Sequence, residues 1–252
     1  MRVFLTGASS GIGAALARHY GARGATLGLV ARREEALRQV GRESGSPFAA
    51  YPCDVSQAGA LRAAAEDFMA RHGVPDLVIA NAGISHGTLT EHAEDLRTFA
   101  EILDVNVLGI VRTFQPFVAP MRERRSGRLA GIASVAGFRG LPGAGAYSAS
   151  KAAAIRYLEA LRVELHGSGV GVSTICPGYV ASPMTERNPY PMPFLLEADD
   201  AARRIARAID AGRSFAVIPW QMAIAARILA IVPNALFDRL AARGGRKPRR
   251  PG

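Results

Sequence analysis

The chain alternates between short apolar runs and longer helical stretches, and this alternation constrains its fold more than any other feature. Strands separated by helices predict parallel β-α-β units with right-handed crossovers. Runs without polar alternation, such as Leu77-Val78-Ile79-Ala80, are typical of strands buried on both faces. Seven such runs predict one doubly wound parallel α/β sheet flanked by helices. The predicted strands are residues 2–6, 26–31, 48–53, 77–80, 128–133, 171–176 and 215–218, and the predicted helices are 13–23, 33–43, 57–72, 91–124, 146–165 and 198–211.

We expect residues 1–243 to form a single domain, because no linker interrupts the pattern. Two parts of it depart from the β-α rhythm. Residues 182–196 contain four prolines and predict an irregular segment that acts as a lid over the substrate. Residues 220–243 form an apolar helical extension, and the basic tail at 244–252 is expected to be disordered.

The apolar run at 220–237 admits three interpretations: a core helix, a subunit contact, or a helix that lies on a membrane surface. Its uncharged stretch at 228–232 is too short to span a bilayer. The sequence alone leaves these three alternatives open, including peripheral membrane contact.

The formal net charge of +10 raises the question of a nucleic-acid partner. We expect none, because no basic run is interleaved with aromatic residues outside the short tail. Cys53 and Cys176 have neither metal-ligand spacing nor a disulfide framework, so we expect no metal site and a reducing compartment. The chain runs from Met1 straight into the first strand, which leaves no room for a targeting segment and favours a cytoplasmic protein.

A glycine pattern follows the first strand and opens the first helix, as in Rossmann-type NAD(P)-binding domains. Gly7 permits a sharp turn, Gly11 lets the backbone approach a pyrophosphate, and Gly13 lets helix and strand pack closely. Free N–H groups at the helix start would then bind the anion. The cofactor contacts expected from this loop are Gly7, Ser9, Ser10, Gly11, Ile12 and Gly13.

The second strand ends in Arg32-Arg33, where an NAD site usually carries an acidic residue for the ribose 2′-hydroxyl. An arginine suits a 2′-phosphate through charge and paired hydrogen bonds. The sequence therefore predicts NADP(H) in preference to NAD(H). The alternative is that both arginines merely begin a solvated helix.

Tyr147 and Lys151 are four residues apart at the start of a predicted helix, so both side chains lie on one face. Lys151 is one of only two lysines in a chain with 31 lysines and arginines, the other being Lys247. A cation beside a phenol lowers its pKa, and a phenol so tuned can exchange a proton with a substrate oxygen. The alternative is an ordinary amphipathic helix.

Taken with these motifs, residues 3–218 resemble the short-chain dehydrogenase/reductase (SDR) family, in its branch of about 250 residues. Two positions depart from the family pattern: Ala80 precedes the Asn81 motif where an asparagine is usual, and Ser182 stands where threonine is commoner. The resemblance implies a catalytic tetrad of Asn106, Ser134, Tyr147 and Lys151, and further cofactor contacts from Asp54, Val55, Asn81, Ala82, Gly83, Tyr147, Lys151, Pro177, Gly178, Val180 and Ser182.

The resemblance implies an oxidoreductase that transfers hydride between NADP(H) and a carbonyl or secondary alcohol. Tyr147 would be the acid/base, Ser134 would bind the reacting oxygen, Lys151 would bind the nicotinamide ribose and lower the Tyr147 pKa, and Asn106 would hold a water in a proton relay. A homodimer or homotetramer is also implied. The alternative is a non-catalytic NADP(H)-binding redox sensor. Side chains expected in the substrate pocket are mostly apolar, which favours a hydrophobic substrate: Ser134, Phe138, Leu141, Tyr179 and Met184.

Overall fold

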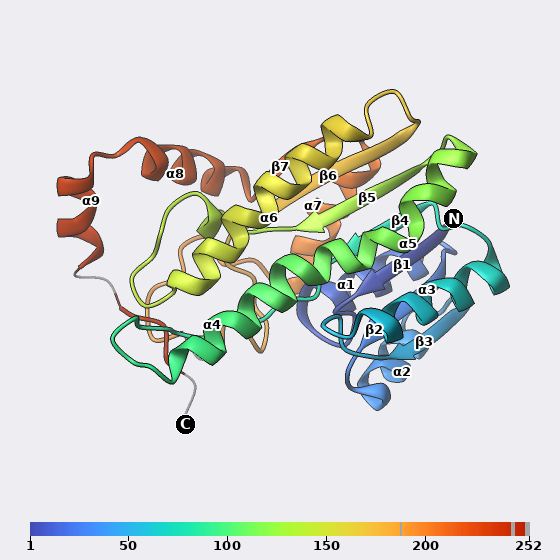
Figure 1. Ribbon diagram of the computed structural model, residues 1–252, viewed down its shortest axis with the longest axis horizontal. Helices are drawn as coiled ribbons and strands as arrows, with labels where there is room; N and C mark the ends of the chain where they lie inside the picture. The colour runs from blue at the N-terminus through green and yellow to red at the C-terminus, as the bar shows by residue number, and fades with distance from the viewer. Residues whose placement is uncertain (187, 243–244, 250–252) are drawn as a thin grey trace.

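The computed structural model describes residues 1–186, 188–242 and 245–249. Their core is a seven-stranded sheet in the order β3-β2-β1-β4-β5-β6-β7, with every neighbouring pair parallel (Figure 1). The predicted doubly wound α/β fold is thereby confirmed. The strands are β1 Arg2–Thr6, β2 Thr26–Ala31, β3 Phe48–Pro52, β4 Leu77–Ala80, β5 Gly127–Ile132, β6 Val170–Pro177 and β7 Phe215–Ile218.

Helices cover both faces of the sheet, and each face has its own apolar core. On one face pack α1 (Gly11–Gly21), α2 (Glu34–Glu43) and α7 (Ala198–Asp210). The other face is covered by α3 (Ala58–His72), α5 (Gly109–Arg124) and α6 (Gly145–Glu164). The helix α4 (Asp95–Leu103) continues through one π-helical turn, η1 (Asp104–Leu108), into α5.

The strand order places β1 and β4 side by side although the chain leaves them toward opposite faces of the sheet. In such sheets a crevice opens beyond the carboxyl ends of the strands at this point, and ligands bind there. The glycine loop after β1 and the Asn81 motif after β4 both lie at this crevice.

The stretch Asp95–Arg124 is, within the described residues, the one helical stretch long and apolar enough to cross a membrane by length and composition. The apolar side chains of this stretch are explained by burial in the core. Ile110, Phe114, Phe117 and Met121 are at most 2% exposed and form part of the core under the sheet. The stretch is therefore a core element of the fold.

Two C-terminal helices, α8 (Trp220–Ile231) and α9 (Asn234–Ala241), stand apart from the sheet (Figure 1). Only Met222 and Ala226 of α8 are buried, and α9 has no buried residue in the part described. Trp220 is 65% exposed and Ile231 is 81% exposed. The core-helix interpretation of residues 220–237 therefore does not describe this chain, whereas the subunit and membrane interpretations stay open.

Arg139 fastens this helical pair to the body of the protein. Its guanidinium donates hydrogen bonds to the carbonyl oxygens of Leu229 and Val232, at 3.0 and 2.8 Å, and to Asn234 Oδ1 at 2.8 Å. The same group lies 4.3 Å from the centre of the Phe237 ring. Arg139 follows the short helix η2 (Val135–Gly137), so α8 and α9 are tied to the loop after β5.

The sequence predicted a disordered tail at 244–252, and the structure differs for residues 245–249. Pro248 and Arg249 lie beside Gly87, in the loop that precedes α4 (Figure 1). Arg249 also forms ion pairs with Glu94 and Asp95, 154 to 155 positions earlier in the chain. Local sequence patterns carry no signal for contacts so distant. Residues 243, 244 and 250–252 lie outside the described residues.

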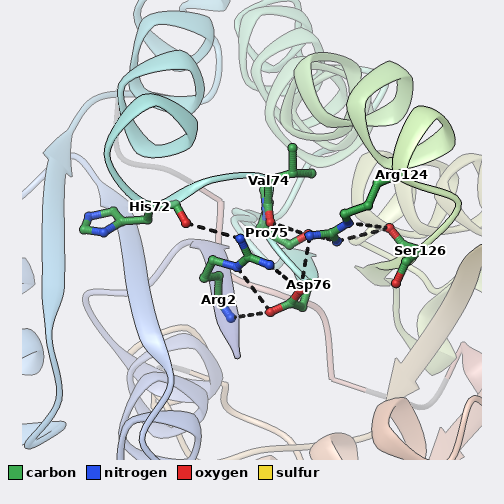
Figure 2. Close-up of polar contacts among 7 residues, drawn as sticks. All are labelled: Arg2, His72, Val74, Pro75, Asp76, Arg124 and Ser126. Carbon is green, nitrogen blue, oxygen red and sulfur yellow. Dashed lines mark hydrogen bonds and ion pairs between the residues drawn. The ribbon is translucent and has the colours of Figure 1, made fainter.

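Figure 2 shows an ion-pair cluster at the amino ends of the strands, on the edge of the sheet opposite to the crevice. The Asp76 carboxylate accepts hydrogen bonds from the Arg2 backbone N–H at 2.8 Å and from Arg2 Nη2 at 3.0 Å. Arg124 Nη1 lies 3.3 Å from the same carboxylate, and its guanidinium also donates to the carbonyl oxygens of Val74 and Pro75. The cluster thereby joins β1, the loop before β4 and the end of α5.

Burial alone would raise the pKa of Asp76, but the hydrogen bonds from Arg2 and the charges of Arg2 and Arg124 outweigh it and hold the pKa below its usual range. We predict that Asp76→Asn lowers the free energy of unfolding at pH 7 by about 1 kcal/mol. Since the folded pKa lies below the unfolded one, this stabilisation is full above about pH 4 and is lost as the pH falls through the folded pKa. Urea denaturation of both proteins at pH 7 and at a pH well below about 4 measures this difference in the free energy of unfolding.

Glu66→Gln is the matched control, because Glu66 pairs with Arg62 at 3.5 Å on an exposed face of α3. It should change the free energy of unfolding much less than Asp76→Asn does. Equal losses in the two variants would contradict a special contribution from the cluster around Asp76.

Candidate functional site

The glycine loop after β1 forms a cradle whose three glycine positions disfavour any side chain. Gly7 and Gly11 have φ angles of +68° and +52°, which L side chains rarely adopt. A Cβ atom on Gly13 would lie 2.1 Å from the carbonyl oxygen of Gly7. The loop therefore brings bare backbone to the start of α1, where N–H groups lack partners within the helix. A cradle of this kind fits the pyrophosphate of a dinucleotide.

Asn81 holds the cradle in place from the neighbouring strand. Its side-chain amide donates to the carbonyl oxygens of Thr6 at 3.1 Å and Gly7 at 3.2 Å, and its backbone N–H donates to Thr6 Oγ1 at 3.2 Å. The amide donors are therefore occupied within the protein. Asn81 thereby fixes the loop that a bound nucleotide would touch.

Arg32 and Arg33 follow β2 and line one end of a cavity that the glycine loop also lines. Arg32 Nη1 is 3.7 Å from Asp54 Oδ2, and Arg33 Nη2 donates to Ser9 Oγ at 3.5 Å. Both arginines are exposed, so their charge is available to a ligand. Two guanidinium groups beside the glycine loop fit the phosphate on an adenosine ribose.

Three of the predicted catalytic residues meet at the opposite end of the cavity. Ser134 follows β5, whereas Tyr147 and Lys151 lie in the first two turns of α6. The Lys151 ammonium donates to the carbonyl oxygen of Ile132 at 2.9 Å and lies 5.7 Å from the centre of the Tyr147 ring. Ser134 Oγ accepts a hydrogen bond from the Ala136 backbone N–H at 3.2 Å, which fixes the hydroxyl at the strand end.

Asn106 is fully buried in the π-helical turn between α4 and α5, behind this group. Its Oδ1 accepts from the Ile84 N–H at 2.8 Å, and its Nδ2 donates to the Ile84 carbonyl oxygen at 2.9 Å and to Ser150 Oγ at 3.0 Å. Asn106 therefore binds the loop after β4 to helix α6. Single π-helical turns are frequent at functional sites, and this one sets the direction of a buried amide.

Burial dominates the electrostatics of the catalytic group. Desolvation raises the pKa of Tyr147, although a hydrogen bond with the Ser134 side chain acts in the opposite direction. Desolvation also lowers the pKa of Lys151, to about 8. The shift of Tyr147 is opposite to the one we expected from Lys151. The protein's own groups thus keep the phenol protonated at neutral pH.

One cavity of about 430 Å³ joins the cradle, the arginines and the catalytic group. Most of the predicted site residues line it, but Gly13, Asn106, Phe138, Leu141 and Tyr179 do not. Gly13 and Asn106 lie behind its wall. The predicted site residues in its lining are Gly7, Ser9, Ser10, Gly11, Ile12, Arg32, Arg33, Asp54, Val55, Asn81, Ala82, Gly83, Ser134, Tyr147, Lys151, Pro177, Gly178, Val180, Ser182 and Met184.

Two predicted pocket residues contact other aromatic side chains. The Phe138 ring lies 6.1 Å from that of Phe215, and the Tyr179 ring lies 6.4 Å from that of Tyr190. Sequence reasoning missed Lys247, whose ammonium lies 5.7 Å from the centre of the Tyr147 ring. The scarcity of lysine in the chain was the one signal that could have pointed to it.

The sequence matches the model of a family described as short chain dehydrogenase over residues 1–191. An uncharacterized oxidoreductase of Myxococcus xanthus is 40% identical and aligns over 95% of each chain. An 11-beta-hydroxysteroid dehydrogenase-like protein (4A) of Arabidopsis thaliana is 34% identical over 94% of this chain and 82% of its own length.

Two solved structures are similar over nearly the whole chain. A short chain dehydrogenase from Burkholderia cenocepacia, in complex with NADP, has a TM-score of 0.82 at 26% identity, with 95% of this chain and 96% of that chain covered. A short chain dehydrogenase/reductase from Burkholderia phymatum, in complex with NAD, has a TM-score of 0.82 at 25% identity, with 100% and 97% covered. Both carry a nicotinamide cofactor, and they differ in which one.

We predict that Gly13→Ala lowers the free energy of unfolding by about 3 kcal/mol, because the added methyl group collides with backbone that cannot yield cheaply. The control is Gly59→Ala, also in a helix, where a Cβ atom would meet nothing within 4 Å. That variant should gain up to about 1 kcal/mol from helix propensity. Denaturant titration compares the two, and losses of similar size would refute the close contact.

Proposed function

The chain belongs to the short-chain dehydrogenase family, and we propose that it is an NADP(H)-dependent oxidoreductase with Tyr147 as its acid/base. Its substrate would be a hydrophobic small molecule that carries a carbonyl or a secondary alcohol. The observation that carries this proposal is the meeting of Ser134, Tyr147 and Lys151 in one cavity with the glycine cradle. A phosphate cradle without an acid/base would serve binding alone, whereas this cavity holds both.

The chemistry follows from what each side chain can do at a carbonyl. A bound nicotinamide supplies or accepts the hydride. In the reductive direction negative charge grows on the carbonyl oxygen, where the Ser134 hydroxyl would donate a hydrogen bond and Tyr147 a proton. The raised pKa of Tyr147 suits this role, since the phenol is in its acid form at neutral pH. Lys151, whose pKa burial lowers to about 8, would return a proton to Tyr147.

Arg32 and Arg33 support the preference for NADP(H). Neither belongs to a core, and both guanidinium groups line the cavity beside Ser9 and Asp54. A 2′-phosphate between them would gain charge-assisted hydrogen bonds that a ribose hydroxyl does not. The NADP-bound relative from Burkholderia cenocepacia supports the choice, whereas the NAD-bound one shows that the fold accepts either.

The hydrophobic substrate is supported by apolar side chains around the catalytic end of the cavity. Met184 and Val180 line it, and Ile84 contributes from the loop after β4. The Arabidopsis relative is named 11-beta-hydroxysteroid dehydrogenase-like, and hydroxysteroids are apolar secondary alcohols. The segment 182–196, which is free of regular helix among its described residues, would serve as the lid.

We also propose a cytoplasmic homo-oligomer, dimer or tetramer. Family membership supports the oligomer, and the free thiols of Cys53 and Cys176 suit a reducing compartment. The exposed apolar residues of α8 would meet a second subunit in that case; contact with a membrane surface through 220–237 is the competing interpretation. Sedimentation with anionic vesicles tests the membrane interpretation, because a protein that stays in the supernatant at low salt contradicts it.

The first test is Tyr147→Phe. It should lower kcat for ketone reduction by about 10²- to 10⁴-fold, since it removes the proton donor. NADPH binding should persist. Tyr157→Phe is the control, because it removes a phenol hydroxyl from the same helix at the edge of the core. Retained turnover in Tyr147→Phe would overturn the assignment, and a wild-type protein that binds NADPH without reducing any ketone or aldehyde would favour the redox sensor.

The second test concerns cofactor choice. The double variant Arg32→Ala/Arg33→Ala should weaken NADPH binding by about 10- to 100-fold, while NADH binding changes by less than about threefold. Arg38→Ala/Arg42→Ala removes the same charge from exposed positions of α2 and should leave the NADPH to NADH ratio unchanged. Fluorescence titration gives both constants, and parallel losses for the two nucleotides would contradict 2′-phosphate recognition.

A further inference from the structure

The described part of the tail, residues 245–249, crosses the catalytic end of the protein as an extended strap. Its backbone pairs with the loop before α4: the Gly87 N–H donates to the Pro248 carbonyl oxygen at 2.8 Å, and Gly87 forms a parallel bridge with Arg249. A Cβ atom on Gly87 would lie 2.2 Å from the Lys247 carbonyl oxygen. The strap therefore sits directly on this loop, in a seat that a side chain would block.

An ion-pair anchor fixes the far end of the strap. Arg249 Nε donates to Asp95 Oδ2 at 2.8 Å and Arg249 Nη2 to Asp95 Oδ1 at 3.0 Å, a paired geometry that holds a guanidinium in one orientation. Nη2 also donates to Glu94 Oε1 at 2.7 Å. The Asp95 side chain is only 8% exposed and accepts a further bond from the Leu89 N–H. Asp95 is therefore the shielded member of the anchor, whereas the Glu94 side chain is 65% exposed.

The strap also touches the two segments that surround Tyr147. Gly143 has a φ of +72°, and a Cβ atom there would lie 3.0 Å from Arg246 Cβ and 3.3 Å from the Lys247 backbone nitrogen. This glycine belongs to the loop that leads into α6. On the other side, a Cβ atom on Gly245 would lie 3.0 Å from Tyr190 Cβ, in the segment 182–196. The strap thus bridges the α6 loop and the expected lid.

This seat puts Lys247 at the catalytic tyrosine. Its ammonium lies 5.7 Å from the centre of the Tyr147 ring, the same distance as that of Lys151. The chain has two lysines among 31 basic residues, and both are found beside this one ring. Lysine differs from arginine in presenting a compact charge with three donors, which suits a single small anion.

Lys247 is partly buried and holds its charge at a cost. Desolvation lowers its pKa to about 8, and among the described residues no carboxylate lies within ion-pair distance of it. The Lys151 ammonium is also desolvated, but it donates a hydrogen bond to the Ile132 carbonyl oxygen. The neighbouring Arg246, in contrast, is exposed to solvent. A partly desolvated ammonium beside a reaction centre is a binding group for an anion.

We propose that Lys247 is a substrate-recognition residue that binds a carboxylate of the substrate, so that the substrate is an oxo acid or hydroxy acid with an apolar body. This inference rests on the proposed function, because the carbonyl oxygen of the same molecule would meet Ser134 and Tyr147. The strap places the cation, the cavity wall accepts the apolar part, and the catalytic pair acts on the carbonyl a few bonds away. Neutral ketones would lack the charged contact.

The experiment uses full-length protein loaded with NADP⁺, which prevents turnover. The probes are aryl oxo acids with one to four carbons between carboxylate and carbonyl, such as 4-oxo-4-phenylbutanoate, each compared with its methyl ester. Calorimetry gives the affinity ratio of acid to ester. Wild type should bind at least one acid about tenfold more tightly than its ester, the size expected for a charge-assisted contact.

Lys247→Met should reduce this ratio to near one. Arg246→Met removes the same charge from the same strap but from an exposed position, and should keep the wild-type ratio. Arg249→Ala should lose the preference although Lys247 is intact, because the strap loses its anchor at Asp95.

The outcomes separate this inference from the proposed function. A wild-type protein that binds NADP⁺ but prefers none of the acids overturns the assignment of Lys247 alone, and so does an unchanged ratio in Lys247→Met. A ratio that falls equally in Arg246→Met would reduce the effect to general charge and overturns it as well. A wild-type protein that fails to bind NADP⁺ overturns the proposed function, and this inference with it.

Discussion

The closeness of α1 to β1 is the constraint on which the rest of the site depends. A Cβ atom on Gly13 would lie 2.1 Å from the Gly7 carbonyl oxygen, so helix and strand meet with backbone against backbone. Asn81 then ties the end of β4 to the same turn through two amide hydrogen bonds. With β1 and β4 joined in this way, the crevice between them has fixed walls. The predicted catalytic side chains after β5 and on α6 are placed relative to those walls.

The sequence was sufficient for features that depend on local pattern. Apolar runs located the boundaries of all seven strands to within one residue, because buried parallel strands leave a plain hydrophobic signal. The glycine spacing and the Tyr147–Lys151 pair were predicted for a similar reason, whereas Ser134 was implied by the family resemblance. Each combines a residue type that the chemistry requires with a position at a strand end or on a helix face.

The features that sequence reasoning missed depend on contacts between distant segments. The anchor of the strap joins Arg249 to Asp95 across 154 positions, and no local pattern marks either residue. Phe138 and Tyr179 follow strands, as pocket residues do, yet their rings pack against Phe215 and Tyr190. The pKa of Tyr147 was misjudged because the lysine was counted as a charge, whereas burial acts on both groups and raises the one while lowering the other.

The way in which the strap is attached separates the residues that fold the domain from the residues that the active site meets. Among its described residues, 245–249 contribute no side chain to either apolar core, and the segment is held by one backbone pairing and one guanidinium. Mutations in it therefore leave the folding of the domain almost untouched. Changes at residues 245–249 can therefore alter what the active site meets while the scaffold stays the same.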